Sequence, residues 1–175
     1  DPDLLPLELD DAFLEECRAS LPELPDAKRH RYETALGLSA YNANVLTADV
    51  ETARQFEALL TSVAAAASKG EGDVAKRVAN WLLSERPGIL GAHSLAADHP
   101  KNSLEANTAI VVATESGLIS GSKAKEIFEA HLISDIDLAS EIEANKQTSD
   151  TGAIEAAVDA VLAANADKVA EYKGG

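Results

Sequence analysis

Apolar side chains recur along much of this chain at the spacing of an amphipathic helix. In the clearest run they fall at i, i+3, i+4, i+7, i+8 and i+11, on Phe56, Leu59, Leu60, Val63, Ala64 and Ala67. Thr47 or Asp49 is the expected start of this helix, and the sequence KGEGD is its expected end. The pattern therefore predicts one long helix that buries a single stripe of side chains.

Shorter helical segments are predicted before this long helix. The first follows a cap at Asp10 or Asp11 and carries an apolar side formed by Phe13, Leu14 and Cys17. The sequence SLPELP ends it. A second helix is expected from a cap at Asp26 to Leu36, because Gly37 can adopt the left-handed conformation that ends a helix. The sequence LSAYNANVLT then predicts a compact helical turn.

A helix from about Asp73 to Glu85 is predicted next, and we expect Pro87 and Gly88 to stop it. Its apolar stripe consists of Val74, Val78, Trp81 and Leu82. Trp81 could stack on a nucleic-acid base, but a lone tryptophan in an apolar helix stripe favours the core. The sequence RPGILGAHSLAADHP is predicted to be the longest irregular stretch of the chain, because it is rich in helix breakers.

Further helices are predicted after this stretch. Asn102 and Glu105 make a capping box for the first, which ends at GLISG and carries Leu104, Ile110, Val111 and Leu118. Ser120 or Ser122 begins the next helix, over KAKEIFEAHL, and residues 135–144 predict a short acidic helix.

The sequence NKQTSD predicts a second boundary. After it, Ser149 or Asp150 caps a helix that ends at Asn165 and has a stripe of Ile154, Ala157, Val158, Val161 and Leu162. A short segment with Val169 and Tyr172 follows. Helices of this length bury too little to be stable alone, because isolated helices shorter than about 12 to 15 residues are marginal in water.

Composition favours an all-α fold. The 175 residues are 46% hydrophobic but only 4% aromatic, and six prolines leave long helices uninterrupted. Cys17 is the single cysteine, so no internal disulfide is possible, and no apolar run approaches the roughly 20 residues that span a bilayer. We predict a helical bundle followed by a small helical tail, no membrane association and a cytoplasmic location.

The net charge of −15 repels phosphate backbones, so contacts with nucleic acid require local basic spots. The sequence KRHR, from Lys28 to Arg31, offers one such spot. These side chains could meet an RNA phosphate. We interpret them instead as a solvated helix face beside acidic neighbours, since short charge runs usually are.

The search for catalytic chemistry is mostly negative. The chain has no glycine-rich phosphate loop of the GxxxxGK or GxGxxG type. Its histidines lack the spacing of a zinc site: His30, His93, His99 and His131. Cys17 has no adjacent base, so a small core residue is favoured over a nucleophile. Carboxylate pairs such as Glu15 and Glu16 are common in an acidic chain, so we interpret them as solvated surface residues and not as general acids or bases. We therefore predict no catalytic residue and no metal ligand.

Four stretches resemble one family in the same order along the chain. They are RASLPELPDAKRHRYETALGLSAYNANVLT (18–47), ANWLLSE (79–85), GLISG with KAKEIFE (117–129) and KQTSDTGAIEAAVDAVLAANADKVAEYKGG (146–175). The chain resembles the C-terminal half of the B subunit of the aspartyl/glutamyl-tRNA amidotransferase. It departs from the family after ISG, where the family commonly has Lys and then a branched apolar residue, while this chain has Ser122 and Lys123.

The resemblance implies an arrangement of domains. Residues 1–10 would link to a preceding catalytic cradle domain, residues 11–143 would form a helical, YqeY-like domain, and residues 144–175 would begin a tail domain that is cut short. The parent protein would use ATP, Mg²⁺ and ammonia that the A subunit releases from glutamine. Together with the A and C subunits, it would convert Asp-tRNA(Asn) or Glu-tRNA(Gln) to Asn-tRNA(Asn) or Gln-tRNA(Gln) in protein biosynthesis.

In this interpretation the chain itself is inactive and holds the tRNA, so that the acceptor end reaches the distant cradle. The candidate tRNA contacts are Lys123, Lys125 and Lys146, because they lie at helix starts or joints that face the tail. The alternative is a stand-alone helical adaptor that resembles YqeY-type proteins and binds a basic protein partner through its acidic surface.

Overall fold

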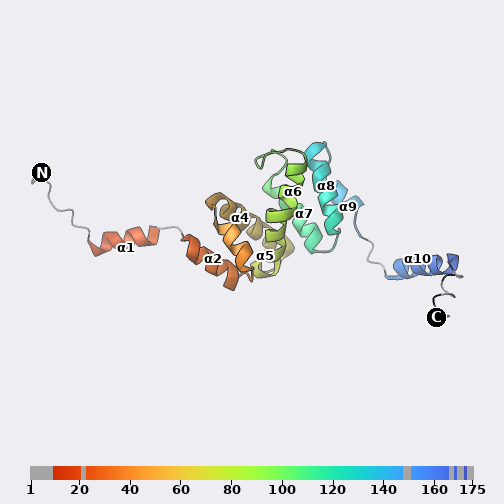
Figure 1. Cartoon of the computed structure of the whole chain (residues 1–175), viewed down its shortest axis with the longest axis horizontal. Helices are drawn as coiled ribbons and strands as arrows, with labels where there is room; N and C mark the ends of the chain where they lie inside the picture. The colour runs from red at the N-terminus through yellow and green to blue at the C-terminus, as the bar shows by residue number, and fades with distance from the viewer. Residues whose placement is uncertain (1–9, 21–22, 148–150, 166–167, 169–171, 173–175) are drawn as a thin grey trace, which may run out of the picture. The chain divides into compact units, whose positions relative to one another are not determined.

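The computed structural model describes residues 10–20, 23–147, 151–165, 168 and 172 (Figure 1). Within these ranges the chain consists of helices, turns and short loops without any strand, which confirms the predicted all-α fold. Of the predicted linker over residues 1–10, only Asp10 is described. The predicted caps Ser149 and Asp150 and the apolar residue Val169 also lie outside the described residues.

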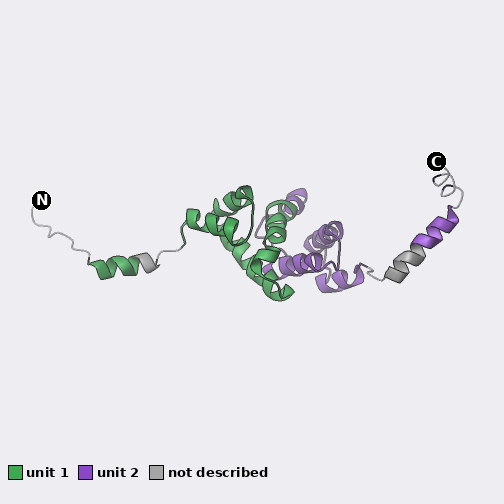
Figure 2. Ribbon diagram, turned by 90° about the horizontal axis from the view of Figure 1, so that it is seen from below, with its two compact units in different colours: residues 1–87 green, residues 88–175 purple. Residues whose placement is uncertain are grey.

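The helices run from Asp11 to Ala164 in the following order: α1 (Asp11–Ser20), α2 (Pro25–Thr34), α3 (Ala40–Thr47), α4 (Val50–Ala67), α5 (Glu71–Asn80), the π-helical turn η1 (Trp81–Glu85), α6 (Arg86–Ala92), α7 (Leu104–Glu115), α8 (Gly121–Ile133), α9 (Leu138–Ala144) and α10 (Thr151–Ala164). The chain divides into two compact units, residues 1–87 and 88–175 (Figure 2). The division into a helical domain at 11–143 and a tail from 144 stays a prediction.

Helix α4 is central to the packing of the first unit, where it contacts both α3 and α5. Its predicted stripe is buried at Phe56, Leu59, Leu60, Val63 and Ala64 and partly exposed at Ala67. Asp49 rather than Thr47 caps the helix, because its carboxylate accepts a hydrogen bond from the Thr52 N–H at 2.8 Å. Ser68, at φ 53°, ends it.

The predicted stop at Pro87 and Gly88 is wrong, since the helix continues through both residues to Ala92. Proline lacks the N–H that an α-helix donates four residues back, and its ring crowds that carbonyl. The turn η1 widens the helix just before Pro87, and the Arg86 N–H donates to the Trp81 carbonyl five residues back. Trp81 is fully buried, as predicted for a core residue.

Two predictions about the first helices need correction. Asp26 does not cap α2: the cap position is Leu24, Pro25 opens the helix and the helix ends at Thr34. Gly37 does adopt the left-handed conformation, at φ 64°. The cap of α1 is Asp10, which accepts from the Phe13 N–H at 2.7 Å.

Cys17 is exposed, so its prediction as a small core residue is wrong. It lies four residues after Phe13, which is 50% exposed, so the two side chains lie on one exposed face of α1.

In the second unit α7 packs against α8, and α9 packs against both. Their core includes Ala106, Ile110, Val111, Ala113, Ile119, Ala124, Ile127, Phe128 and Leu132. Ser103 rather than Asn102 caps α7, since its hydroxyl accepts from the Ala106 N–H. Ser120 caps α8 in the same way. Leu104 and Leu118, both predicted to belong to the helix that GLISG closes, are exposed, and α7 ends at Glu115, before Leu118.

Helix α10 ends just before Asn165, as predicted. Its described side chains are exposed, including the apolar residues Val158, Val161 and Leu162. No helix among the described residues has the length and hydropathy needed to cross a membrane.

Candidate functional site

The three lysines predicted to contact RNA lie near one end of α8. Lys123 and Lys125 occupy the first turns of α8, and Lys146 follows the end of α9. The Gln147 N–H donates to the Leu118 carbonyl at 2.7 Å, which joins the segment after α9 to the turn before α8. Lys146 therefore lies near the N-terminal end of α8, the end that carries Lys123.

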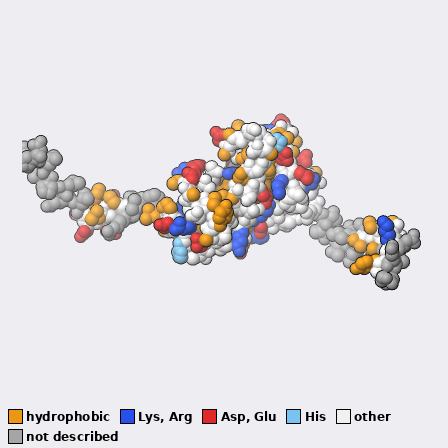
Figure 3. Space-filling model, in the orientation of Figure 1, with side chains coloured by type: hydrophobic (Ala, Val, Ile, Leu, Met, Phe, Trp, Pro, Cys, Tyr) orange, Lys and Arg blue, Asp and Glu red, His pale blue; other side chains and the backbone are white. Residues whose placement is uncertain are grey.

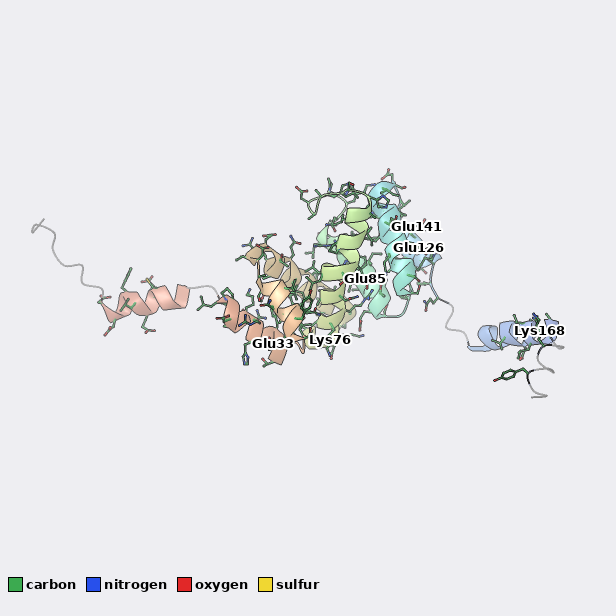
Figure 4. All side chains as sticks on the ribbon, viewed as in Figure 1. Glu33, Lys76, Glu85, Glu126, Glu141 and Lys168 are labelled. Atoms are coloured by element: carbon green, nitrogen blue, oxygen red, sulfur yellow. The ribbon has the colours of Figure 1, made fainter. Side chains whose placement is uncertain are left out.

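Two of these lysines form local ion pairs. Lys123 pairs with Glu126, which is labelled on α8 in Figure 4, and Lys146 Nζ lies 2.6 Å from Glu143 Oε1. Pairs of this exposed i, i+3 kind contribute only about 0 to 1 kcal/mol, so an RNA phosphate can replace the carboxylate at little cost. Lys125 is exposed and forms no ion pair with any described residue.

The cationic sequence KRHR divides between two environments. Arg29 pairs with Asp26 on an exposed helix face and His30 is exposed, which fits the predicted solvated face. Lys28 and Arg31 instead turn toward acidic side chains from other segments.

Glu57 on α4 is the carboxylate that receives them. It accepts from Lys28 Nζ at 3.0 Å and from the Arg31 guanidinium, which also reaches Glu23 Oε2 at 2.7 Å. Burial opposes ionisation of Glu57, but the hydrogen bonds from Arg31 and Lys28 outweigh it and hold the pKa of Glu57 below its usual value. The hydrogen bond from Arg31 likewise lowers the pKa of Glu23. These contacts join α2 to α4, so we interpret Lys28 and Arg31 as residues that stabilise the fold.

A second ionic group lies along α5, η1 and α6. Arg77 Nη1 is 3.0 Å from Glu85 Oε1, and the Asn80 amide also donates to Glu85. Arg86 has a different partner, because its Nη2 donates to the neutral Gln55 Oε1 on α4 at 3.1 Å.

The histidines do not converge on a metal site. His93 Nε2 lies 2.6 Å from Glu129 Oε1, and His99 Nδ1 accepts from the Lys101 N–H at 3.3 Å. Among the residues that the structure describes, no three His, Cys, Asp or Glu side chains are grouped so that they could hold a metal ion.

The polar anchoring of the loop 93–103 was not predicted from the sequence. Asn107, 3% exposed, donates to Asn102 Oδ1 at 2.9 Å and to the Ser103 carbonyl at 2.7 Å. The Asn102 amide in turn donates to the Ala97 carbonyl. The sequence does place an asparagine in the first turns of a predicted helix. The short amide side chain of such a residue can form hydrogen bonds with residues near the start of the helix, which could have indicated this contact.

The described surface carries acidic and basic side chains intermingled over the helices (Figure 3). Most of the described cations form ion pairs. No group of side chains among the residues that the structure describes resembles a catalytic constellation. Comparison with known sequences places this domain. Residues 61–175 match the GatB domain family, and the chain belongs to that family.

Curated relatives match the full length of the chain. It is 62% identical over 177 aligned positions to the B subunit of the aspartyl/glutamyl-tRNA(Asn/Gln) amidotransferase of Novosphingobium aromaticivorans, covering 100% of this chain and 36% of that protein. The corresponding B subunits of Erythrobacter litoralis and Rhizorhabdus wittichii are each 54% identical over 100% of this chain and over 36% and 35% of their own lengths. The chain thus spans about a third of the length of these relatives.

Proposed function

We propose that this chain is the part of an aspartyl/glutamyl-tRNA amidotransferase B subunit that holds the tRNA and makes or breaks no bond itself. The observation that carries this proposal is the 62% identity, over the whole chain, to a protein of that name. The all-helical fold and the paired surface charges support a positioning role. Positioning can contribute substantially to rate, because holding reactants in place removes an entropic cost from the chemical step.

In this proposal the bond-making groups belong to other parts of the enzyme. ATP, Mg²⁺ and glutamine-derived ammonia would act on the misacylated tRNA elsewhere in the parent complex, with the A and C subunits as partners. The purified chain should then neither hydrolyse glutamine nor turn over ATP. Turnover of either substrate by this chain would contradict the proposed role.

The proposed tRNA contacts are Lys123, Lys125 and Lys146. Their position at one end of α8 supports a common surface, and the weak carboxylate pairs of Lys123 and Lys146 leave both ammonium groups available. Three phosphate contacts should appear in the salt dependence of binding, since each neutralised phosphate adds about 0.7 to 0.9 to the slope of log K against log salt concentration.

The test replaces all three lysines with glutamine in the complete amidotransferase and measures tRNA affinity over a range of salt. The expected result is weaker binding and a slope lower by about 2 to 3. A matched control removes three exposed cations from the first unit, at Arg29, Arg54 and Lys76, and should leave the slope nearly unchanged. Equal effects of the two triple variants would show that only net charge matters and would overturn the assignment.

A further inference from the structure

Arg86 differs from the other arginines whose side chains the structure describes. Each of the others has a carboxylate within ion-pair distance: Arg29 has Asp26, Arg31 has Glu23 and Glu57, Arg54 has Glu51, and Arg77 has Glu85. Arg86 has only the neutral amide oxygen of Gln55, and its Nε is buried without a hydrogen-bond partner. Within the described part of the chain, its guanidinium therefore has no counter-charge.

The missing counter-charge is notable in a chain with 30 acidic residues and a net charge of −15. Burial lowers the pKa of Arg86 because removing the guanidinium from water disfavours its charged form. Arginine nevertheless stays protonated in proteins, so the guanidinium of Arg86 keeps its positive charge despite its burial. Charges taken out of water are normally paired, and this one is not paired by any described residue.

The neighbouring carboxylates are already engaged. Glu85, labelled in Figure 4, precedes Arg86 in sequence but bonds to Arg77 and Asn80. Glu51 pairs with Arg54 at 2.9 Å and accepts from the Gln55 amide at 3.3 Å. Near Gln55, the Glu51 carboxylate is thus engaged by Arg54 and by the Gln55 amide, and Arg86 pairs with no described carboxylate.

The backbone at Arg86 is also special. Arg86 follows the π-helical turn η1 and precedes Pro87, and π turns inside helices are frequent at functional sites. The turn fixes where the Arg86 side chain leaves the helix, and Gln55 holds one edge of its guanidinium. Gln55 leaves the Nη1 group and one Nη2 N–H of Arg86 to bind phosphate oxygens, which suit the planar geometry of a guanidinium.

We propose that Arg86, oriented by Gln55, binds a phosphate oxyanion and that the RNA backbone supplies it. The choice of RNA rests on the proposed function, whereas the anion site rests on the unpaired guanidinium alone. A carboxylate from a protein partner is the competing occupant, and the test separates it from phosphate.

The first experiment follows the Arg86 Nε–H signal of the 175-residue chain by NMR. Inorganic phosphate should shift this signal at constant ionic strength, while chloride and acetate leave it in place. Phosphate should also raise the melting temperature of the wild-type chain but not of the Arg86→Gln variant. The variant itself should melt no lower than wild type without phosphate, because it loses an unpaired charge. An Nε–H signal that ignores phosphate, or follows acetate equally, would overturn the site.

The second experiment measures binding of a tRNA transcript to the chain with Arg86→Gln, Arg86→Lys and, as a charge-matched control, Arg29→Gln. Arg86→Gln should weaken binding several-fold and lower the salt slope by about 1. Arg86→Lys should fall between, since lysine keeps the charge without the fork. Arg29→Gln should bind like wild type.

The outcomes distinguish the two proposals. If the transcript binds and Arg86→Gln changes neither affinity nor slope, the inference about Arg86 is wrong while the proposed function stands. The other outcome is that neither the wild-type chain nor any variant binds the transcript, although phosphate still shifts the Arg86 signal. In that case the chain does not bind RNA, and the RNA backbone does not supply the phosphate that Arg86 binds.

Discussion

Arg77 and Glu85 form an ion pair across eight residues of one continuous helix, with Nη1–Oε1 at 3.0 Å and Nη2–Oε2 at 3.3 Å. In a regular α-helix, residues eight positions apart differ by about 80° around the axis, at roughly 100° per residue. The π turn η1 takes up an extra residue between them and so brings the two side chains toward one face.

Replacing Arg77 with methionine should destabilise the first unit by about 2 kcal/mol. The Glu85 side chain is only 12% exposed and would lose its cation, and an uncompensated buried charge is costly. Urea unfolding followed by circular dichroism measures the change. The control is Arg54→Met, which breaks an exposed pair and should cost less than about 1 kcal/mol. Equal losses would contradict a special role for the pair at the π turn.

Tyr32→Phe should stabilise the protein by about 1 kcal/mol. The Tyr32 hydroxyl is buried close enough to Glu57 to influence its pKa, but it makes no hydrogen bond of ordinary geometry with any described residue, and leaving a buried polar group unsatisfied costs about 1 to 3 kcal/mol. Phenylalanine keeps the ring, which packs edge-on against Phe56 at a centroid distance of 5.0 Å. Differential scanning calorimetry should show a higher melting temperature, and a lower one would mean that the hydroxyl is satisfied in solution.

The sequence predicted the helices because their apolar positions have a clear period. It failed at Pro87, since periodicity does not reveal that a π turn lets a helix pass a proline. It also failed at Cys17, whose place on an apolar face was identified correctly although that face is exposed. A pattern shows which side chains share a face, but not which partner covers that face.

The candidate site shows a similar limit. The lysines Lys123 and Lys146 could be chosen from their places at helix starts and joints, but their pairing with acidic neighbours required side-chain geometry. Arg86 was not singled out at all. Its distinguishing property is that no described carboxylate pairs with it in three dimensions, and no local sequence signal reports that its partner is the neutral Gln55.

Asn107→Leu should loosen the loop 93–103 and destabilise the second unit by about 1 to 3 kcal/mol. The variant keeps the number of side-chain heavy atoms but removes the amide that donates to Asn102 and to the Ser103 carbonyl, which leaves both acceptors without that bond. Hydrogen exchange should rise in the loop more than in α8. Thr108→Leu, a change at the half-buried next position of α7, is the control. Uniform exchange changes across α7 and α8 would instead indicate general damage to the core.

Acid should weaken the contact between α2 and α4, and the sign follows from the pKa values. The pKa of Glu57 and that of Glu23 are lowered in the folded state, while glutamate in an unfolded chain has a pKa of about 4.3. The stabilisation is therefore fully present above about pH 4.3 and disappears as the pH falls through the lower folded values, where both carboxylates take up protons.

Glu57→Gln tests this assignment. At pH 7 the variant should be less stable than wild type by about 1 kcal/mol, because Lys28 and Arg31 lose a charged acceptor on a site that is partly exposed. The two stability curves should converge as the pH falls from about 4.3 toward 3, since protonation removes the same charge from the wild type. Glu33→Gln removes an α2 carboxylate that forms no ion pair with any described residue, and its curve should follow the wild type at every pH. Urea midpoints measured at half-unit steps from pH 7 to 3 decide the matter: a constant gap between wild type and Glu57→Gln would show that the lost stability comes from packing and not from the ionised carboxylate.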